Sequence, residues 1–139
     1  MDHLILRVVV IDDEAIARQG IITRLKDLNN VEVVAECGNA EQAMDAVSLH
    51  KPDLLLVDIN MPKISGIELV ARLQGKEQPM VIFVTAFDRF AVEAFELHAV
   101  DYLLKPVSTE RLIQALDLVR ERLLLKGAEV ETARLQRVV

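Results

Sequence analysis

Five polar side chains stand at the ends of short apolar runs that lie far apart in the chain. They are three carboxylates, a hydroxyl and an amine: Asp12, Asp13, Asp58, Thr85 and Lys105. Carboxylates that are held together repel one another and resist joint ionisation unless a cation lies among them. Mg²⁺ suits such a set, because it prefers oxygen ligands and is commonly bound by one or two carboxylates together with phosphate oxygens. Brought together, these groups would indicate phosphoryl chemistry at a magnesium site.

The expected nucleophile is Asp58, which follows the apolar run over residues 54–57. An aspartate can attack phosphorus and form an aspartyl-phosphate. Lys105 would hold one phosphoryl oxygen and Thr85 would donate a hydrogen bond to another, which is the positioning and electrostatic stabilisation that phosphoryl transfer needs. Aspartate is also a common turn residue, so this interpretation depends on the elements that carry the other groups.

Short apolar runs alternate with longer amphipathic stretches along the chain. The expected strands cover residues 4–11, 31–36, 54–58, 80–86 and 101–105, and the expected helices cover 14–28, 39–50, 66–74, 88–98 and 108–126. Such alternation predicts an α/β fold, a doubly wound five-stranded parallel sheet with helices on both faces. The second and fifth strands are the least apolar and are the expected edges.

The expected helices also carry start and stop signals. Asn39, Ser65, Asp88 and Ser108 are the expected N-caps. After Gly127 the helical periodicity weakens. Residues 1–126 are therefore expected to form the folded domain, and residues 127–139 a frayed helix, a tail or the start of a linker.

A parallel sheet of this kind explains why the polar groups would meet. Right-handed crossovers place the carboxyl ends of all the strands along one edge. Ligands of open α/β sheets bind at that edge, where the strand order reverses. The five groups are therefore expected to share one shallow site.

Composition narrows the class of protein. The chain has 139 residues, the size of one compact domain, and its formal net charge of −6 argues against a grip on nucleic-acid phosphates. Cys37 is its one cysteine, which excludes an internal disulfide, and no His/Cys cluster has zinc-ligand spacing. No apolar run approaches the ~20 residues of a membrane span, and no secretory leader is recognisable at the N-terminus. These features favour a cytoplasmic domain without membrane contact.

Four ordered motifs carry a resemblance to a known family. VVVIDDE, LLLVDINMPKISG, VIFVTA and DYLLKP resemble the receiver domain of two-component response regulators over roughly residues 5–125. The resemblance implies a flavodoxin-like (βα)5 fold with strand order 2-1-3-4-5. It also implies that the chain is a phosphorylation-controlled switch, with Asp58 as phosphoacceptor, rather than a turnover enzyme.

The resemblance further implies a ligand set for Mg²⁺ or Mn²⁺. Asp13 and Asp58 would bind the metal, Asp12 would help through water or a looser contact, and the backbone carbonyl of Asn60 would complete the protein ligands.

The same comparison assigns a switch and two structural residues. Thr85 and Lys105 would bind the phosphoryl group, and Tyr102 would be the aromatic residue that turns inward when Thr85 moves. Pro106 matches the position of a cis peptide bond, and Gly66 matches the glycine after the loop that follows the third strand.

The resemblance also implies partners. A sensor histidine kinase, or a small acyl phosphate, would donate the phosphoryl group, and water would later remove it. Residues 84–112 look like receivers of regulators with a LytTR-type DNA-binding domain, so DNA would be contacted only through a C-terminal domain absent from this chain. The face made by the fourth helix, fifth strand and fifth helix would pair two receivers on activation.

Three other functions remain open. A phosphatase of the haloacid dehalogenase type would need a second aspartate as general acid at the position of Asn60, whose amide does not titrate. A flavodoxin-like FMN binder would need a phosphate loop after the first strand, where DDEAIA has the wrong charge. The residues do not exclude a stand-alone receiver that docks to a protein, without a DNA-binding domain.

Overall fold

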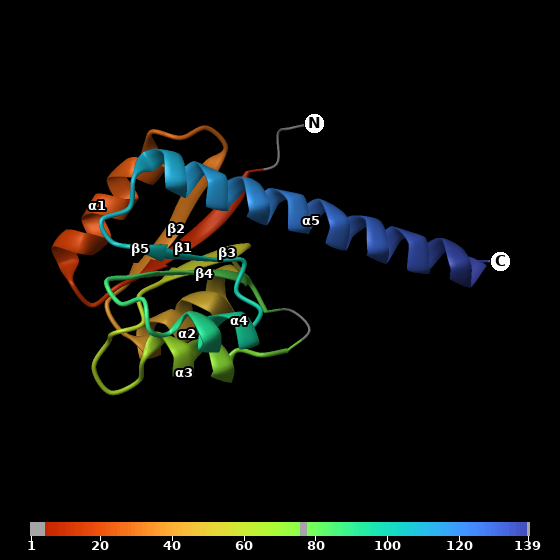
Figure 1. Ribbon diagram of the computed structural model, residues 1–139. Coiled ribbons are helices and arrows are strands. Elements are labelled where there is room, and N and C mark those ends of the chain that lie inside the picture. Colours follow the sequence, from red (N-terminus) through yellow and green to blue (C-terminus); the bar gives the residue numbers. More distant parts are fainter. Residues whose placement is uncertain (1–4, 76–77, 139) are drawn as a thin grey trace.

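Five strands and five helices alternate along the computed structural model, which describes residues 5–75 and 78–138 (Figure 1). The strands are β1 (Leu6–Ile11), β2 (Val31–Cys37), β3 (Leu54–Val57), β4 (Met80–Thr85) and β5 (Asp101–Leu104). The helices are α1 (Ala15–Lys26), α2 (Ala40–His50), α3 (Gly66–Arg72), α4 (Ala91–Glu96) and α5 (Thr109–Val138). The strands form one parallel sheet in the order β2-β1-β3-β4-β5, so the predicted fold class and strand order are confirmed.

Helices cover both faces of the sheet and create two apolar layers. In Figure 1, α1 and α5 lie on one face, and α2, α3 and α4 lie on the other. Successive side chains of a strand point to opposite faces, so Val8 and Val10 join the first layer while Val9 and Ile11 join the second. Burial on both faces explains why the central strands are continuous apolar runs.

The two edge strands are the ones that the sequence predicts. β2 and β5 contain partly exposed residues, whereas all four residues of β3 are buried. The central position of β3 matters for the site, because it puts the residue that follows Val57 in the middle of the sheet edge.

Three predicted helix caps are confirmed. The side-chain oxygens of Asn39, Ser65 and Ser108 each accept a hydrogen bond from the backbone N–H three residues later, at 2.8, 3.1 and 3.1 Å. These bonds satisfy N–H groups that have no partner inside the helix. They fix the starts of α2, α3 and α5, and therefore the ends of the loops that precede them.

The predicted cap at Asp88 is wrong. Helix α4 begins after Phe90, which makes no side-chain capping bond. The preceding loop is held by contacts with its surroundings instead, since the Tyr102 hydroxyl donates to the carbonyl of Phe87. The Arg89 guanidinium lies 4.9 Å from the centroids of both the Phe87 and Phe90 rings. These contacts, one with β5 and two within the loop, outweigh the preference of aspartate for a helix start.

Helix α5 is longer than predicted and continues through Gly127 to Val138. Leu123 packs against the core, while Leu124 and Leu125 are exposed, and Figure 1 shows the rest of the helix projecting from the domain. A glycine inside a helix lowers the stability of the helix by only about 1 kcal/mol relative to alanine. Gly127 therefore does not end α5. The other element boundaries lie within three residues of the predicted ones. Among the described residues, no helix is both long and apolar enough to cross a membrane.

Candidate functional site

The register of the sheet places two aspartates side by side. Ile11 pairs with Val57, and the next residues of the two strands are Asp12 and Asp58. Their backbones continue the ladder, because the N–H of Asp58 donates to the carbonyl of Ile11 at 2.9 Å and the N–H of Asp12 donates to that of Cys37 at 3.0 Å. The sheet therefore presents both carboxylates rigidly at its carboxyl edge.

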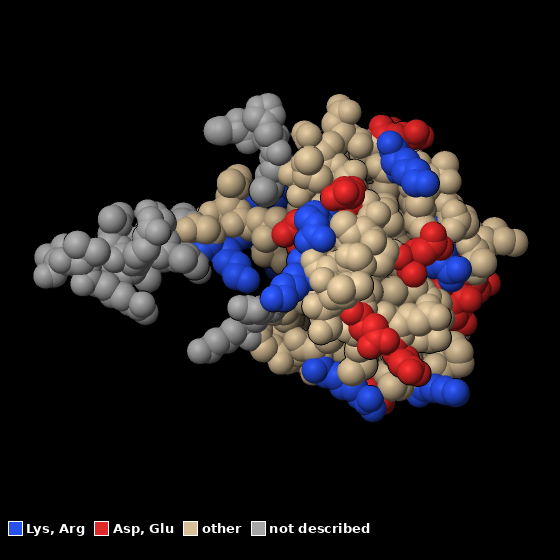
Figure 2. Space-filling view, turned by 180° about the vertical axis from the view of Figure 1, so that it is seen from behind, with Lys and Arg blue, Asp and Glu red and all other residues tan. Residues whose placement is uncertain are grey.

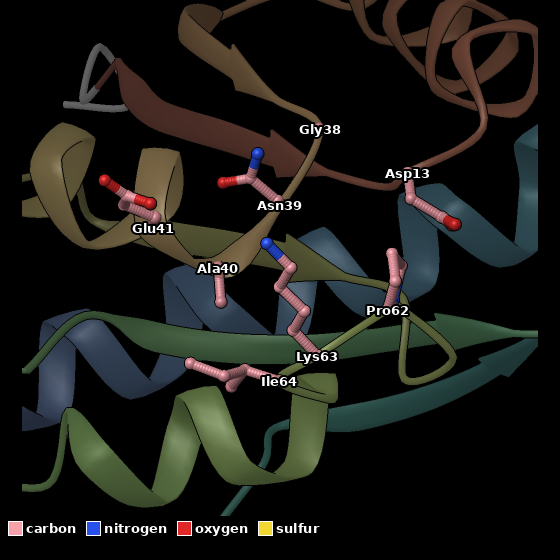
Figure 3. Close-up of a pocket in the computed structure, with 8 residues that line it drawn as sticks. All are labelled: Asp13, Gly38, Asn39, Ala40, Glu41, Pro62, Lys63 and Ile64. Carbon is pink, nitrogen blue, oxygen red and sulfur yellow. The ribbon is translucent and has the colours of Figure 1, made fainter.

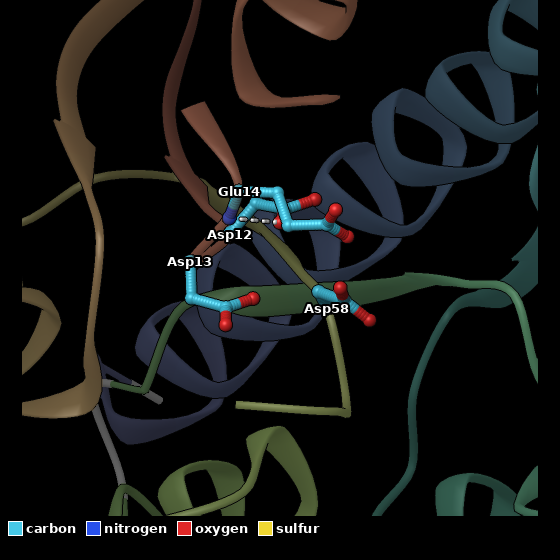
Figure 4. Close-up of side chains that lie close together, drawn as sticks. All are labelled: Asp12, Asp13, Glu14 and Asp58. Atoms are coloured by element: carbon cyan, nitrogen blue, oxygen red, sulfur yellow. Dashed lines mark hydrogen bonds between the residues drawn. The ribbon is translucent and has the colours of Figure 1, made fainter. Parts of the chain in front are cut away.

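Four carboxylates converge at this edge. One oxygen from each of Asp12, Asp13, Glu14 and Asp58 lies within 4.8 Å of the others, and Figure 4 shows these side chains close together. We call these four residues the acidic cluster. Asp12 and Asp58 are only 4% and 5% exposed, whereas Asp13 and Glu14 are exposed. A set made only of hard oxygen donors, half buried and half open to solvent, fits a divalent cation that keeps some of its waters.

Glu14 is the member of the cluster that the sequence analysis did not assign to the site. Its only signal was its position directly after the two aspartates. The N–H of Glu14 donates to Oδ1 of Asp12 at 2.9 Å, and this bond folds the loop so that three successive carboxylates face one point.

Lys105 contacts two members of the acidic cluster. Its Nζ donates to Oδ2 of Asp12 at 2.7 Å and to Oδ2 of Asp58 at 3.1 Å. Burial lowers the pKa of Lys105, but the hydrogen bonds to the two carboxylates raise this pKa by more than burial lowers it. The pKa of Lys105 is therefore above the ordinary value. The amine is therefore held as an ammonium between the carboxylates. The peptide bond between Lys105 and Pro106 is cis, as the resemblance implied.

Thr85 is the buried last residue of β4 and lies beside Lys105, whose N–H donates to its carbonyl at 2.8 Å. Its hydroxyl accepts a hydrogen bond from the N–H of Phe87 at 3.4 Å. The carbonyl of the same Phe87 accepts from the hydroxyl of Tyr102, and burial raises the pKa of that hydroxyl. Thr85 and Tyr102 are thus linked through the backbone N–H and the backbone carbonyl of Phe87. The sequence carries no signal for this link.

The loop after β3 is shaped by a close approach of backbone to backbone. The N–H of Asn60 donates to Oδ1 of Asp58 at 3.3 Å, and the N–H of Gly66 donates to the carbonyl of Ile59 at 2.8 Å. A Cβ atom on Gly66 would lie 2.3 Å from the carbonyl oxygen of Asp58, so glycine is required here. The role of the Asn60 carbonyl as a metal ligand stays a prediction.

A cavity of about 450 Å³ lies next to the acidic cluster (Figure 3). Asp13, the start of α2 at residues 38–41 and the loop at residues 62–64 line it, and the last of these includes Lys63. Asp13 thus belongs to both the cavity and the acidic cluster, and the cavity gives solvent access to the cluster at this carboxylate.

Comparisons with known proteins agree with this geometry. The family model described as the response regulator receiver domain matches residues 8–117. An uncharacterised response regulatory protein of Yersinia pestis is 43% identical over 122 residues, which are 88% of this chain and 51% of that protein. Transcriptional regulatory protein BtsR of Escherichia coli K12 is 43% identical over 116 residues, 84% of this chain and 48% of that protein. The chain spans about half the length of these curated relatives.

Solved structures lead to the same family. The response regulatory domain of mrkE from Klebsiella pneumoniae superposes with a TM-score of 0.78 at 30% identity, covering 84% of this chain and 97% of that one. The REC domain of AraT from Geobacillus stearothermophilus gives a TM-score of 0.77 at 34% identity, covering 89% and 99%. With its sheet order, its acidic edge and a family match that covers most of its length, the chain belongs to the response regulator receiver domains of two-component systems.

Proposed function

We propose that this receiver domain is switched by phosphorylation of Asp58 with Mg²⁺ or Mn²⁺ as the metal. The observation that carries the proposal is the contact of Lys105 Nζ with both Asp12 and Asp58 inside a cluster of four carboxylates. A buried aspartate next to an ammonium and a cation site can accept a negatively charged group that an isolated carboxylate would repel.

The chemistry is a transfer between two nucleophiles. An oxygen of Asp58 attacks the phosphorus of a phosphohistidine on a sensor histidine kinase, the P–O bond forms, and the P–N bond breaks with its electron pair going to the imidazole. Asp13, Asp58 and the Asn60 carbonyl would hold a divalent cation, with Asp12 helping through water or a looser contact, and this cation would supply positive charge that offsets repulsion between the carboxylates and the phosphoryl oxygens. Lys105 moves its ammonium from the carboxylates to a phosphoryl oxygen and holds the product.

The signal leaves the site through Thr85. When its hydroxyl turns to donate to a phosphoryl oxygen, it loses the bond from the N–H of Phe87. The carbonyl of Phe87 is also the acceptor for Tyr102, so the loop before α4 and the ring on β5 respond together. This moves the surface made by α4 and β5.

That surface is apolar enough to receive a partner. Phe95 and Val92 on α4 are 82% and 67% exposed, and Leu104 at the end of β5 is 49% exposed. We call these three residues the α4–β5 patch. Large apolar side chains exposed to solvent are candidates for an interaction site, and a second copy of the activated receiver is the partner we propose.

The output would be transcriptional regulation by a cytoplasmic protein. Relatives of which this chain covers 48% are named transcriptional regulatory proteins, and residues 84–112 resemble receivers joined to a LytTR-type DNA-binding domain. We therefore place the receiver at residues 1–126 and a connection to such a domain after it. The face of the receiver in Figure 2 carries basic and acidic side chains interspersed, and the formal net charge of the chain is −6. A negative chain is poorly suited to bind nucleic-acid phosphates, so we assign DNA contact to the effector domain.

Mass spectrometry of the intact chain tests the acceptor directly. After incubation with acetyl phosphate and Mg²⁺, the wild type should gain one phosphoryl group and Asp58→Asn should gain none. Chelation of the metal with EDTA should abolish the gain. A phosphoryl group on the Asp58→Asn variant would place the acceptor elsewhere.

A further inference from the structure

The side chain of Arg18, on α1, reaches back to the loop that carries the acidic cluster. Its Nη1 donates to the backbone carbonyl of Asp12 at 2.7 Å, and its Nε donates to Oε1 of Glu36 near the end of β2 at 2.9 Å. The side chain of Arg18 is 18% exposed. The guanidinium of Arg18 thus joins α1 to β2 and to the loop after β1. Neither of these two hydrogen bonds involves a carboxylate of the acidic cluster.

Glu36 holds the guanidinium in this position. Its Oε1 also accepts a hydrogen bond from Nε2 of Gln19 at 2.9 Å. The hydrogen bond from Arg18 is the main cause that lowers the pKa of Glu36, so the carboxylate is ionised at neutral pH. Gln19, the next residue of α1, therefore helps to fix the carboxylate that orients Arg18.

The bond to the Asp12 carbonyl completes the fixation of that residue. The N–H of Asp12 donates to Cys37, Oδ1 accepts from Glu14, Oδ2 accepts from Lys105, and the carbonyl accepts from Arg18. All four polar atoms of Asp12 thus have a partner. The carbonyl that Arg18 contacts belongs to the planar peptide unit between Asp12 and Asp13. The orientation of this unit therefore sets the direction in which the side chain of Asp13 points.

We propose that Arg18 is a positioning residue for the cation site, which orients the Asp12–Asp13 peptide unit through its bond to the Asp12 carbonyl. The inference rests on the proposed function, because the cation is the Mg²⁺ that phosphorylation requires. Groups that orient metal ligands without touching the metal are typically worth ten- to a hundredfold in metal affinity.

Geometry and charge predict opposite results, which makes the proposal testable. If Arg18 acted only as a positive charge near the acidic cluster, its removal would make the site more negative and Mg²⁺ would bind more tightly. If Arg18 orients the peptide unit, its removal weakens Mg²⁺ binding. Arg18→Gln separates the two, and Arg72→Gln is the matched control, because Arg72 carries the same charge in an exposed ion pair with Glu68 on α3.

The measurement is a titration of ¹⁵N-labelled chain with MgCl₂, followed by NMR through the amide signals of the acidic cluster. We expect Arg18→Gln to raise the Kd for Mg²⁺ by about tenfold or more and to shift the Asp13 amide before any metal is added. Arg72→Gln should match the wild type in both readouts. Arg18→Lys keeps the charge but lacks the planar fork of donors, so its Kd should lie between those of Arg18→Gln and the wild type.

The outcomes separate this inference from the proposed function. Mg²⁺ binding by Arg18→Gln that equals or exceeds that of the wild type overturns the positioning role while leaving the cation site intact. If Arg18→Gln does not fold, Arg18→Lys decides, and a Kd equal to that of the wild type overturns the role. Failure of the wild type to bind Mg²⁺ overturns the cation site itself and the inference with it.

Discussion

Single atoms around Asp58 determine what the site can accept. The carboxylate of Asp58 is buried against the ammonium of Lys105, and its backbone carbonyl faces Gly66 at a distance that leaves no space for a side chain. The contact with Lys105 sets the charge around the carboxylate, and the contact with Gly66 limits the space beside the backbone. Both contacts can be tested with single substitutions, and the contact with Gly66 can be tested without any phosphoryl donor.

Gly66→Ala should destabilise the domain by about 2 kcal/mol or more, because overpacking forces the backbone to move. The added Cβ would lie 2.3 Å from the Asp58 carbonyl and 2.9 Å from Cα of Ile59. Urea denaturation followed by circular dichroism measures the change. Gly20→Ala is the control, because its nearest new contact would be the end of the Arg24 side chain at 3.8 Å, and alanine should stabilise α1 by about 0.5–1 kcal/mol. Equal stabilities of the two variants would contradict the steric argument.

The residues that carry chemistry were predictable where a strand delivers them. Asp12, Asp13 and Asp58 directly follow apolar strands, and the structure brings them within 4.8 Å of one another. Arg18 was not predictable as a partner of the site, because its contacts depend on how α1 crosses the end of β2. The link through the backbone of Phe87 was equally hidden, since any residue type offers an N–H and a carbonyl.

At the scale of elements, local chemistry determined most helix starts, and the surroundings determined the exceptions. Asn39, Ser65 and Ser108 cap their helices as predicted because the bond joins residues three apart. Asp88 does not cap α4, because contacts of Arg89 and Tyr102 hold the preceding loop. The end of α5 was missed for the opposite reason, since Gly127 is too weak a stop signal to end an established helix.

The capping bond at the start of α5 should be worth about 1 kcal/mol of folding free energy. Ser108→Ala removes the acceptor for the N–H of Arg111, whereas Ser108→Asp keeps one. We expect the alanine variant to lose that stability in urea denaturation and the aspartate variant to retain it. Ser48→Ala, on an exposed turn inside α2, is the control and should be neutral or slightly stabilising. A neutral Ser108→Ala variant would show that the cap is redundant.

At the scale of the whole molecule, the sheet separates the acidic cluster from the α4–β5 patch. The acidic cluster lies at the carboxyl edge of the central strands, and the α4–β5 patch lies at one side of the sheet, with β5 as the edge strand. We propose that an event at Asp58 reaches the patch through Thr85, the loop before α4 and Tyr102 on β5. A change of association state is the expected readout.

Sedimentation velocity should show a dimer of the wild type after addition of beryllofluoride and Mg²⁺, and a monomer without them. Phe95→Asp places a charge at the most exposed side chain of the α4–β5 patch, since the phenylalanine is 82% exposed, so this variant should stay monomeric under both conditions. Leu49→Asp is the matched control, because Leu49 is 77% exposed on α2, which packs against the opposite edge strand β2. A wild type that stays monomeric when activated would contradict the proposed dimer.

The projecting part of α5 has a mechanical consequence. Beyond Leu123 the helix leaves the core and continues to Val138, a lever of roughly 22 Å at about 1.5 Å per residue. A tilt of about 10° at its base would carry the far end about 4 Å, and each inserted residue would rotate that end by about 100°. Small rearrangements beneath the helix are thus magnified with distance, and their direction depends on the number of residues along the rod.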